Sequence, residues 1–269
     1  YLLPNEAVSE NYQFKINKIS KYLKKKKSDF LFVTASENNA WLLNIRGKDS
    51  KYSPIPHCHS LIDNKGRVIF FCDLNKVSSV IKRKLKKIKF FSIKSINDLL
   101  LKIKKKKFII DRNTCSVHFE KSILKNNKIL KFEDPIYFEK AIKSKKEIYN
   151  IKKAHYHDGV AVTKYLFWIK KNFYKRKITE ISASNELYKL RKKNNNFKSL
   201  SFPTISGTGP NAAIIHYMAS KKTDRKLKKG DIYLVDSGGQ YNFGTTDVTR
   251  TISLKNSNKR IKDIYTRVL

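Results

Sequence analysis

The sequence predicts an α/β domain followed by an α+β domain. The first part of this prediction rests on alternating helical and strand-like patterns with short connections over residues 13–137. The second rests on two long helical patterns that precede a strand-rich segment, Asp231 to Leu254 (DIYLVDSGGQYNFGTTDVTRTISL). Glu133-Asp134-Pro135 marks the boundary, because proline disfavours helix at the residue before it. We therefore expect domains at 13–137 and 138–269, and a tail at 1–12 that belongs to an upstream segment.

The first domain begins with a helix between Phe14 and Leu23, where apolar residues recur at helical spacing. Asn64-Lys65-Gly66 predicts a hairpin turn between Leu61-Ile62 and Val68 to Phe71. The remaining elements alternate along the chain. Strands are expected at 29–34, 90–93, 108–111 and 129–132, and helices at about 75–88, 96–103 and 116–126.

Two helices are expected to open the second domain, at about 140–171 and 179–193. The first carries a broad apolar stripe at helical spacing. Its members are Ile142, Ile148, Ile151, Val160, Tyr165, Leu166 and Ile169. Gly159 weakens this helix by about 1 kcal/mol relative to alanine, and we expect it to permit a close helix contact. His155 and His157 face different directions on a helix, which favours structural or surface roles for them.

A β-hairpin carries the candidate site. Ile232 to Val235 and Thr245 to Leu254 are β-favouring runs on either side of Asn242-Phe243-Gly244. This pairing puts Asp236 within two residues of the position opposite Asp247, and cross-strand neighbours lie about 5 to 8 Å apart. A cation between two carboxylates would remove the cost of burying them. Turn or surface roles are the alternative, against which the predicted mid-strand position of Asp247 argues.

The charge of the chain is strongly positive, with 59 Lys and Arg against 22 Asp and Glu, a formal net charge of +37. Such a balance raises nucleic acid as a partner. The charge is nearly all lysine, however, and is spread along the chain in runs such as 24–27 and 104–107. The sequence has neither the cysteine and histidine spacing of a zinc finger nor the aromatic signature of an RNA-binding domain. We therefore expect weak binding to polyanions at low salt and no specific nucleic-acid partner.

Three scattered cysteines, Cys58, Cys72 and Cys115, lack CxxC spacing, which argues against a disulfide framework. His57-Cys58-His59 suggests a metal site only weakly, because neighbouring residues on a strand point to opposite faces. No run approaches the roughly 20 apolar residues of a membrane span, and the N-terminal stretch is unlike a signal peptide. We expect a cytoplasmic protein with no membrane partner.

Two long motifs carry a family resemblance. Ser201 to Tyr217 (SFPTISGTGPNAAIIHY) and Tyr233 to Ile252 (YLVDSGGQYNFGTTDVTRTI) resemble the catalytic domain of the Xaa-Pro aminopeptidases, also called aminopeptidase P. These are pita-bread metallopeptidases, as are prolidase, creatinase and methionine aminopeptidase. Thr34 to Pro56 (TASENNAWLLNIRGKDSKYSPIP) is similar to their middle domain. The resemblance implies a creatinase/prolidase N-terminal-like domain followed by the first half of a pita-bread domain.

The resemblance also implies roles for individual residues. It assigns Asp236 and Asp247 as ligands of two divalent metal ions, with Mn²⁺ expected and Zn²⁺ or Co²⁺ as alternatives. It assigns His216 to contact the substrate and stabilise the transition state. Arg46 could reach an acidic substrate group, although a structural loop role is the stronger interpretation. The implied substrates are peptides with proline at the second position, and a homodimer is a common assembly in this family.

The family's metal site uses two Asp, one His and two Glu, and only Asp236 and Asp247 can be placed in this sequence. We therefore expect the chain to be an incomplete part of a metalloaminopeptidase and inactive by itself. Two alternatives stay open. The protein could be a prolidase that cleaves Xaa-Pro dipeptides, or a non-catalytic pita-bread protein that binds nucleic acid or protein.

Overall fold

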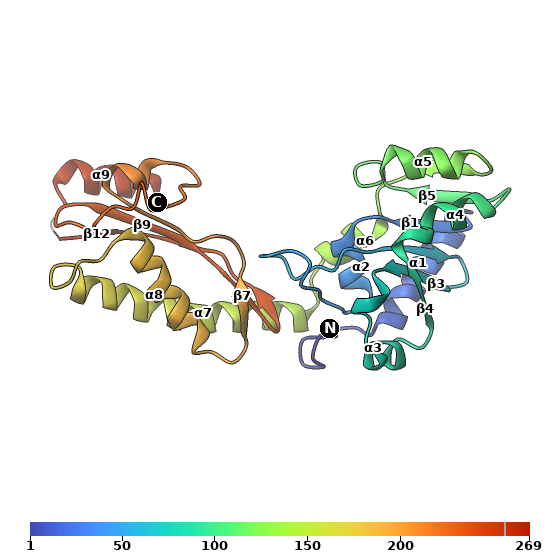
Figure 1. The fold of residues 1–269 in the computed structure, drawn as a ribbon, viewed down its shortest axis with the longest axis horizontal. Coiled ribbons are helices and arrows are strands. Elements are labelled where there is room, and N and C mark those ends of the chain that lie inside the picture. The colour runs from blue at the N-terminus through green and yellow to red at the C-terminus, as the bar shows by residue number, and fades with distance from the viewer. Residues whose placement is uncertain (256) are drawn as a thin grey trace. The chain divides into compact units, whose positions relative to one another are not determined.

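The computed structural model describes residues 1–255 and 257–269, drawn in Figure 1. The chain divides into two compact units, Tyr1–Glu147 and Ile148–Leu269. The segment expected as an upstream tail contacts the first unit. Leu2 forms a β-bridge with Ile45, and the backbone N–H of Leu3 donates to the carbonyl of Asn44 at 2.9 Å.

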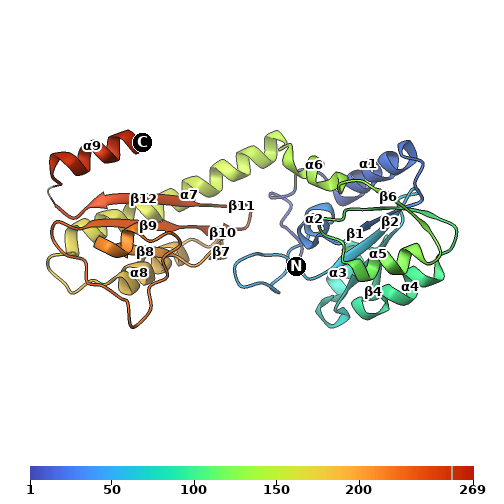
Figure 2. The same ribbon diagram turned by 90° about the horizontal axis from the view of Figure 1, so that it is seen from above.

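The first unit is built on a six-stranded sheet with the order β4-β3-β2-β1-β5-β6 (Figures 1 and 2). Strand β2 runs antiparallel to β1 and β3, and the other neighbours pair in parallel. The predicted hairpin turn is confirmed between β2 and β3, where Gly66 takes a φ of 80°. The strands are β1 (Phe30–Val33), β2 (His59–Asp63), β3 (Val68–Cys72), β4 (Ile88–Ser92), β5 (Lys107–Ile110) and β6 (Lys128–Lys131).

Helices cover both faces of this sheet. Leu31 and Val33 of β1 pack in one core with α1, and Phe32 packs in a second core with α4 and α5. This alternation is what an α/β layer structure requires of a buried strand. The helices are α1 (Tyr12–Lys25), α2 (Ser36–Leu42), η1 (Leu74–Lys76), α3 (Ser79–Lys84), η2 (Ile93–Ser95), α4 (Ile96–Lys102), α5 (Val117–Leu124) and α6 (Pro135–Ala141).

The expected continuous helix at 75–88 is wrong. The chain forms only η1 and the short α3, with an extended residue, Val77, between them. Ser78 starts a new helix because its hydroxyl accepts the backbone N–H of Ile81. A capping serine inside the helical pattern therefore divides the segment.

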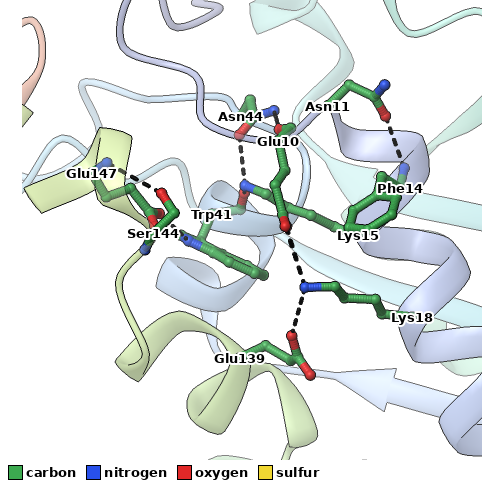
Figure 3. A network of polar contacts seen from close by, with 10 residues as sticks. All are labelled: Glu10, Asn11, Phe14, Lys15, Lys18, Trp41, Asn44, Glu139, Ser144 and Glu147. Carbon is green, nitrogen blue, oxygen red and sulfur yellow. Dashed lines mark hydrogen bonds and ion pairs between the residues drawn. The ribbon is translucent and has the colours of Figure 1, made fainter.

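A buried lysine joins α1 to α2, as Figure 3 shows. The Lys15 ammonium donates to the carbonyl of Trp41 and to Oδ1 of Asn44, both at 2.8 Å, and lies 3.9 Å from the Trp41 ring centroid. Burial lowers the pKa of Lys15 to about 8. The indole N–H of Trp41 in turn donates to Glu147 at 3.3 Å. Trp41 thus packs at the edge of the core of the first unit.

Asp134 gives the first unit a pH-dependent stability. This buried carboxylate caps α6 by accepting the N–H of Ile136 at 2.9 Å, and it also accepts from Asn38 at 2.8 Å. Burial raises the pKa of Asp134 to about 6. A raised pKa means that the group's contribution to stability is fully present below its unfolded pKa of about 4 and is lost as pH rises through about 6.

We expect the free energy of unfolding of the first unit to fall, between pH 4 and pH 7, by on the order of 2 kcal/mol more in the parent chain than in Asp134→Asn. The two tryptophans, Trp41 and Trp168, lie in different units. Urea titrations followed by ¹⁹F NMR of 5-fluorotryptophan therefore report on each unit separately. Asp98→Asn, an exposed change on α4, is the control. Equal pH slopes in parent and Asp134→Asn would contradict this prediction.

The second unit packs two helices against one face of a small sheet. Val162 and Tyr165 of α7 and Leu187 of α8 form a core with Tyr233 and Val235 of β9. Its strands form two sheets, with the orders β12-β9-β8 and β11-β10-β7. Its elements are α7 (Lys145–Asn172), α8 (Glu180–Lys192), β7 (Phe197–Leu200), β8 (Ile205–Thr208), η3 (Gly209–Ala213), β9 (Ile232–Ser237), β10 (Gly239–Tyr241), β11 (Gly244–Thr245), β12 (Val248–Ser253) and α9 (Lys259–Val268).

Helix α7 begins at Lys145, five residues later than about 140, because Ser144 and Glu147 cap it reciprocally. Only part of the predicted stripe is buried, since Tyr165 and Ile169 are fully covered while Val160 is 42% exposed. The expected close helix contact at Gly159 is wrong: a Cβ there would meet nothing within 4 Å. No helix in the described part of the chain is long and apolar enough to span a membrane.

Candidate metal centre

The break between β9 and β10 at Gly238, called the kink below, shapes the candidate site. Gly238 separates β9 from β10, and a Cβ at this position would lie 1.9 Å from the carbonyl oxygen of Thr246 and 2.2 Å from Oγ of Ser201. Hydrogen bonds hold this close approach. The Ser201 hydroxyl donates to the Thr246 carbonyl at 2.9 Å, and the Thr246 N–H donates to the carbonyl of Gly239 at 2.9 Å. The residue before Asp247 is thereby held against the kink.

Asp236 and Asp247 converge next to this kink. Asp236 lies in β9 and pairs with Thr249 of β12, so Asp247 is two residues from the directly opposite position, within the predicted register. The predicted mid-strand position of Asp247 is wrong, because it lies in the break between β11 and β12. The break arises where Thr246 turns away to pair with Gly239.

The two carboxyl groups lie close enough for the charge of Asp236 to act on the Asp247 carboxyl group. Although Asp247 remains exposed to solvent, desolvation of its carboxyl group and the charge of Asp236 raise its pKa, and His155 opposes this effect. His155 itself lies on α7, with its Nδ1 3.0 Å from the carbonyl oxygen of Ile151.

The carboxylate pair fits a divalent cation. Asp236 Oδ1 is buried and has no hydrogen-bond partner in the part of the chain that the structure describes. Such an atom beside a second carboxylate is unfavourable unless a cation neutralises both. Carboxylate oxygens suit hard and borderline ions such as Mn²⁺. No cluster of three His, Cys, Asp or Glu side chains that could hold an ion occurs among residues 1–255 and 257–269, so the pair is an incomplete ligand set by itself.

A buried ion pair between Arg191 and Asp158 forms hydrogen bonds with residues on both sides of Gly238. Arg191 of α8 donates to both carboxylate oxygens of Asp158 of α7, at 2.7 and 2.9 Å, and both side chains are fully buried. Arg191 also donates to Ser237, and the hydroxyl of Tyr241 donates to Asp158 at 2.7 Å. The ion pair therefore fixes residues on both sides of Gly238. Sequence reasoning missed it, since nothing local links residues 33 positions apart.

His216 lies in a loop and not in a strand. It follows η3 in a turn closed by a hydrogen bond from the N–H of Tyr217 to the carbonyl of Ile214, and its φ is 55°. The imidazole is exposed. Glu180, a fully buried carboxylate on α8, accepts hydrogen bonds from this loop and was not singled out in the sequence.

Arg46 has backbone partners in the first unit. Its guanidinium donates to the carbonyls of Ile45 at 2.8 Å and Ala40 at 3.3 Å, and burial lowers its pKa. These bonds are those of a structural loop residue. Cys58, Cys72 and Cys115 are free and buried, and His59 Nδ1 lies 3.1 Å from the carbonyl oxygen of Thr34.

Comparison with known families agrees with this architecture. Residues 1–147 match the creatinase/prolidase N-terminal domain, and residues 149–269 match metallopeptidase family M24. The chain belongs to the creatinase/prolidase metallopeptidase family. The expected fold class is thereby confirmed: an α/β domain of the creatinase/prolidase N-terminal class, followed by part of a pita-bread domain.

Relatives within this family include named aminopeptidases. Xaa-Pro aminopeptidase 1 of Dictyostelium discoideum is 34% identical over 276 residues, which cover 100% of this chain and 43% of that protein. X-prolyl aminopeptidase of Caenorhabditis elegans, described as a cytosolic enzyme with a di-nuclear active site, matches with a TM-score of 0.89 and 25% identity over 97% of this chain and 44% of its own.

Xaa-Pro dipeptidase from Bacillus anthracis shares the fold, with a TM-score of 0.74 and 22% identity over 95% of this chain and 69% of its own. The chain spans less than half the length of the curated family members that it matches.

Proposed function

We propose that this chain contributes the middle domain, at about 13–137, and the first part of the catalytic domain, from about 138, to a metal-dependent Xaa-Pro aminopeptidase. The enzyme would release the N-terminal residue from peptides whose second residue is proline. The observation that carries the proposal is the convergence of Asp236 and Asp247, with a buried oxygen of Asp236 left without a partner. The named aminopeptidase relatives support the same substrate class.

In this proposal Asp236 and Asp247 hold two divalent ions, Mn²⁺ in preference to Zn²⁺ or Co²⁺, together with ligands from a further segment of the protein. Such ions, when bound, supply an activated water as nucleophile near neutral pH. His216 donates a hydrogen bond to the carbonyl oxygen of the scissile bond, where negative charge develops. Arg46 is proposed as a contact for an acidic substrate group, subordinate to its bonds to backbone carbonyls.

Cytoplasmic location and a homodimer complete the proposal. The description of the Caenorhabditis elegans relative as cytosolic supports the first. The three free cysteines suit a reducing compartment.

Peptide cleavage separates the candidate functions. We expect the full-length protein, supplied with Mn²⁺, to cleave an Xaa-Pro-Xaa tripeptide, and chelation to abolish the cleavage. Residues 1–269 alone should give no cleavage, because two carboxylates cannot complete the ligand set. Cleavage confined to the Xaa-Pro dipeptide would establish a prolidase instead. No cleavage of either, together with steeply salt-dependent binding of nucleic acid, would establish a binding protein.

A further inference from the structure

The His216 turn is held in an unfavourable backbone conformation. His216 is the third residue of the turn from Ile214 to Tyr217, and its φ of 55° is left-handed. Glycine or asparagine usually occupies such a position, because a side chain raises its energy. Non-glycine residues persist there only when surrounding contacts hold the backbone. Ile214, Ile215 and His216 are all exposed, so burial of their own side chains does not hold the backbone.

Contacts of the next residue, Tyr217, hold the backbone of the turn in place. Tyr217 is only 6% exposed, whereas its neighbours on both sides point to solvent. Its hydroxyl donates to Oε2 of Glu180 at 2.8 Å and lies 3.1 Å from the carbonyl oxygen of Thr223. Burial and the adjacent Glu180 carboxylate raise the pKa of Tyr217, so the phenol stays a neutral donor. The side chain following His216 is therefore anchored in the interior.

Glu180 connects this anchor to both ends of the loop. It is fully buried and accepts from the backbone N–H of Thr208 at 2.8 Å and of Arg225 at 3.1 Å. The side-chain amide of Asn211 lies 3.1 Å from both of its oxygens. One carboxylate thus gathers donors from the start, the middle and the end of the segment 208–225. Its position in the first turn of α8 also suits a negative charge.

We propose that Glu180 and Tyr217 are positioning residues that hold the His216 imidazole in its working orientation. This inference rests on the proposed function, in which His216 contacts the substrate. Misplacing a group at a reacting centre by about 1 Å lowers turnover as much as roughly 100-fold. A buried clamp that fixes the residue adjacent to His216 prevents such displacement.

The test is a double-mutant cycle in the full-length protein, loaded with Mn²⁺ and assayed on an Xaa-Pro-Xaa tripeptide. Tyr217→Phe removes only the hydroxyl, and His216→Asn removes the imidazole while tolerating the left-handed backbone. We expect Tyr217→Phe alone to lower kcat roughly 10- to 100-fold with little change in KM. In the His216→Asn background the same change should cost about twofold or less. Residues that act as one unit are non-additive in this way.

Glu180→Gln is the second probe, because its amide would present hydrogen atoms to donors that need an acceptor. Glu186→Gln makes the same chemical change on α8, where Glu186 pairs with Lys189 at 3.8 Å, and is the matched control. Hydrogen exchange of the segment 209–218, measured by mass spectrometry, gives a readout independent of activity. Exchange should accelerate at least about tenfold in Tyr217→Phe and Glu180→Gln and stay unchanged in Glu186→Gln.

The outcomes separate this inference from the proposed function. A Tyr217→Phe loss that persists in full in the His216→Asn background would overturn the positioning role and leave a general structural one. Unchanged exchange in both variants would overturn the clamp whatever the activity. A parent protein that cleaves no Xaa-Pro peptide would overturn the proposed function, and the exchange rates would still decide whether Glu180 and Tyr217 hold the turn.

Discussion

Asparagine in place of either Asp236 or Asp247 is expected to lower kcat/KM of the full-length protein for an Xaa-Pro-Xaa peptide by at least about 100-fold. Each change removes a carboxylate charge from a pair of residues that act on each other electrostatically, one of which has a buried, unpartnered oxygen. Shape is preserved, so the loss would reflect charge and ligation. Asp263→Asn on α9, where the carboxylate is exposed and pairs with Arg267, is the control and should leave the rate unchanged.

Asp247→Asn should also change the stability of the protein, and the change should depend on whether metal is present. In the metal-free protein, Asp247→Asn removes the repulsion from Asp236 and is expected to raise the melting temperature. Added Mn²⁺ should then raise the melting temperature of the parent, because a ligand that binds only the folded state stabilises it. Asp247→Asn should not respond. Equal Mn²⁺ responses in parent and variant would contradict the role of this carboxylate.

Gly238→Ala is expected to destabilise the second unit by more than about 3 kcal/mol. The new Cβ would lie 1.9 Å from the carbonyl oxygen of Thr246, which accepts from Ser201, while the N–H of Thr246 donates to Gly239; Thr246 cannot move away without breaking these bonds. Urea unfolding of the labelled chain measures this effect through the ¹⁹F signal of Trp168, and the signal of Trp41 in the first unit should stay unchanged.

Gly159→Ala provides the matched control within the same unit. A Cβ there meets nothing within 4 Å, and the site is the interior of α7. Alanine should therefore stabilise the unit by about 0.5 to 1 kcal/mol. If both alanine variants shift stability by a similar small amount, the close approach of Gly238 and Thr246 is not what holds the kink.

Local patterns in the sequence predicted much of the fold. The apolar spacing before Leu23 and the Asn64-Lys65-Gly66 turn depend only on nearby residues, and the structure has both elements. Periodicity failed where a capping group decided the boundary, as Ser78 and Ser144 do. Periodicity also could not show which face of α7 is buried, because burial there depends on partners such as Arg191, far away in sequence.

The candidate site was likewise predictable only where it depends on local sequence patterns. Strand pairing alone put Asp236 near Asp247, and the register agrees. The break in the strand before Asp247 depends on a tertiary contact of Gly238 that no local pattern contains. Two isoleucines before His216 are typical of a strand. The structure has a tight turn there instead, and Tyr217, which closes the turn, is bonded to Glu180, a residue far away in sequence. The roles of Asp236, Asp247, His216 and Arg46 remain predictions.

Asp236 and Asp247 are proposed to hold a metal ion together. Anomalous diffraction from crystals of the full-length protein soaked in Mn²⁺ tests this claim. An anomalous peak is expected within roughly 2.0 to 2.6 Å of carboxylate oxygens from both residues. In Asp247→Asn crystals the peak should disappear or lose most of its height. Ordered carboxylates with no peak between them, at saturating Mn²⁺, would contradict the claim.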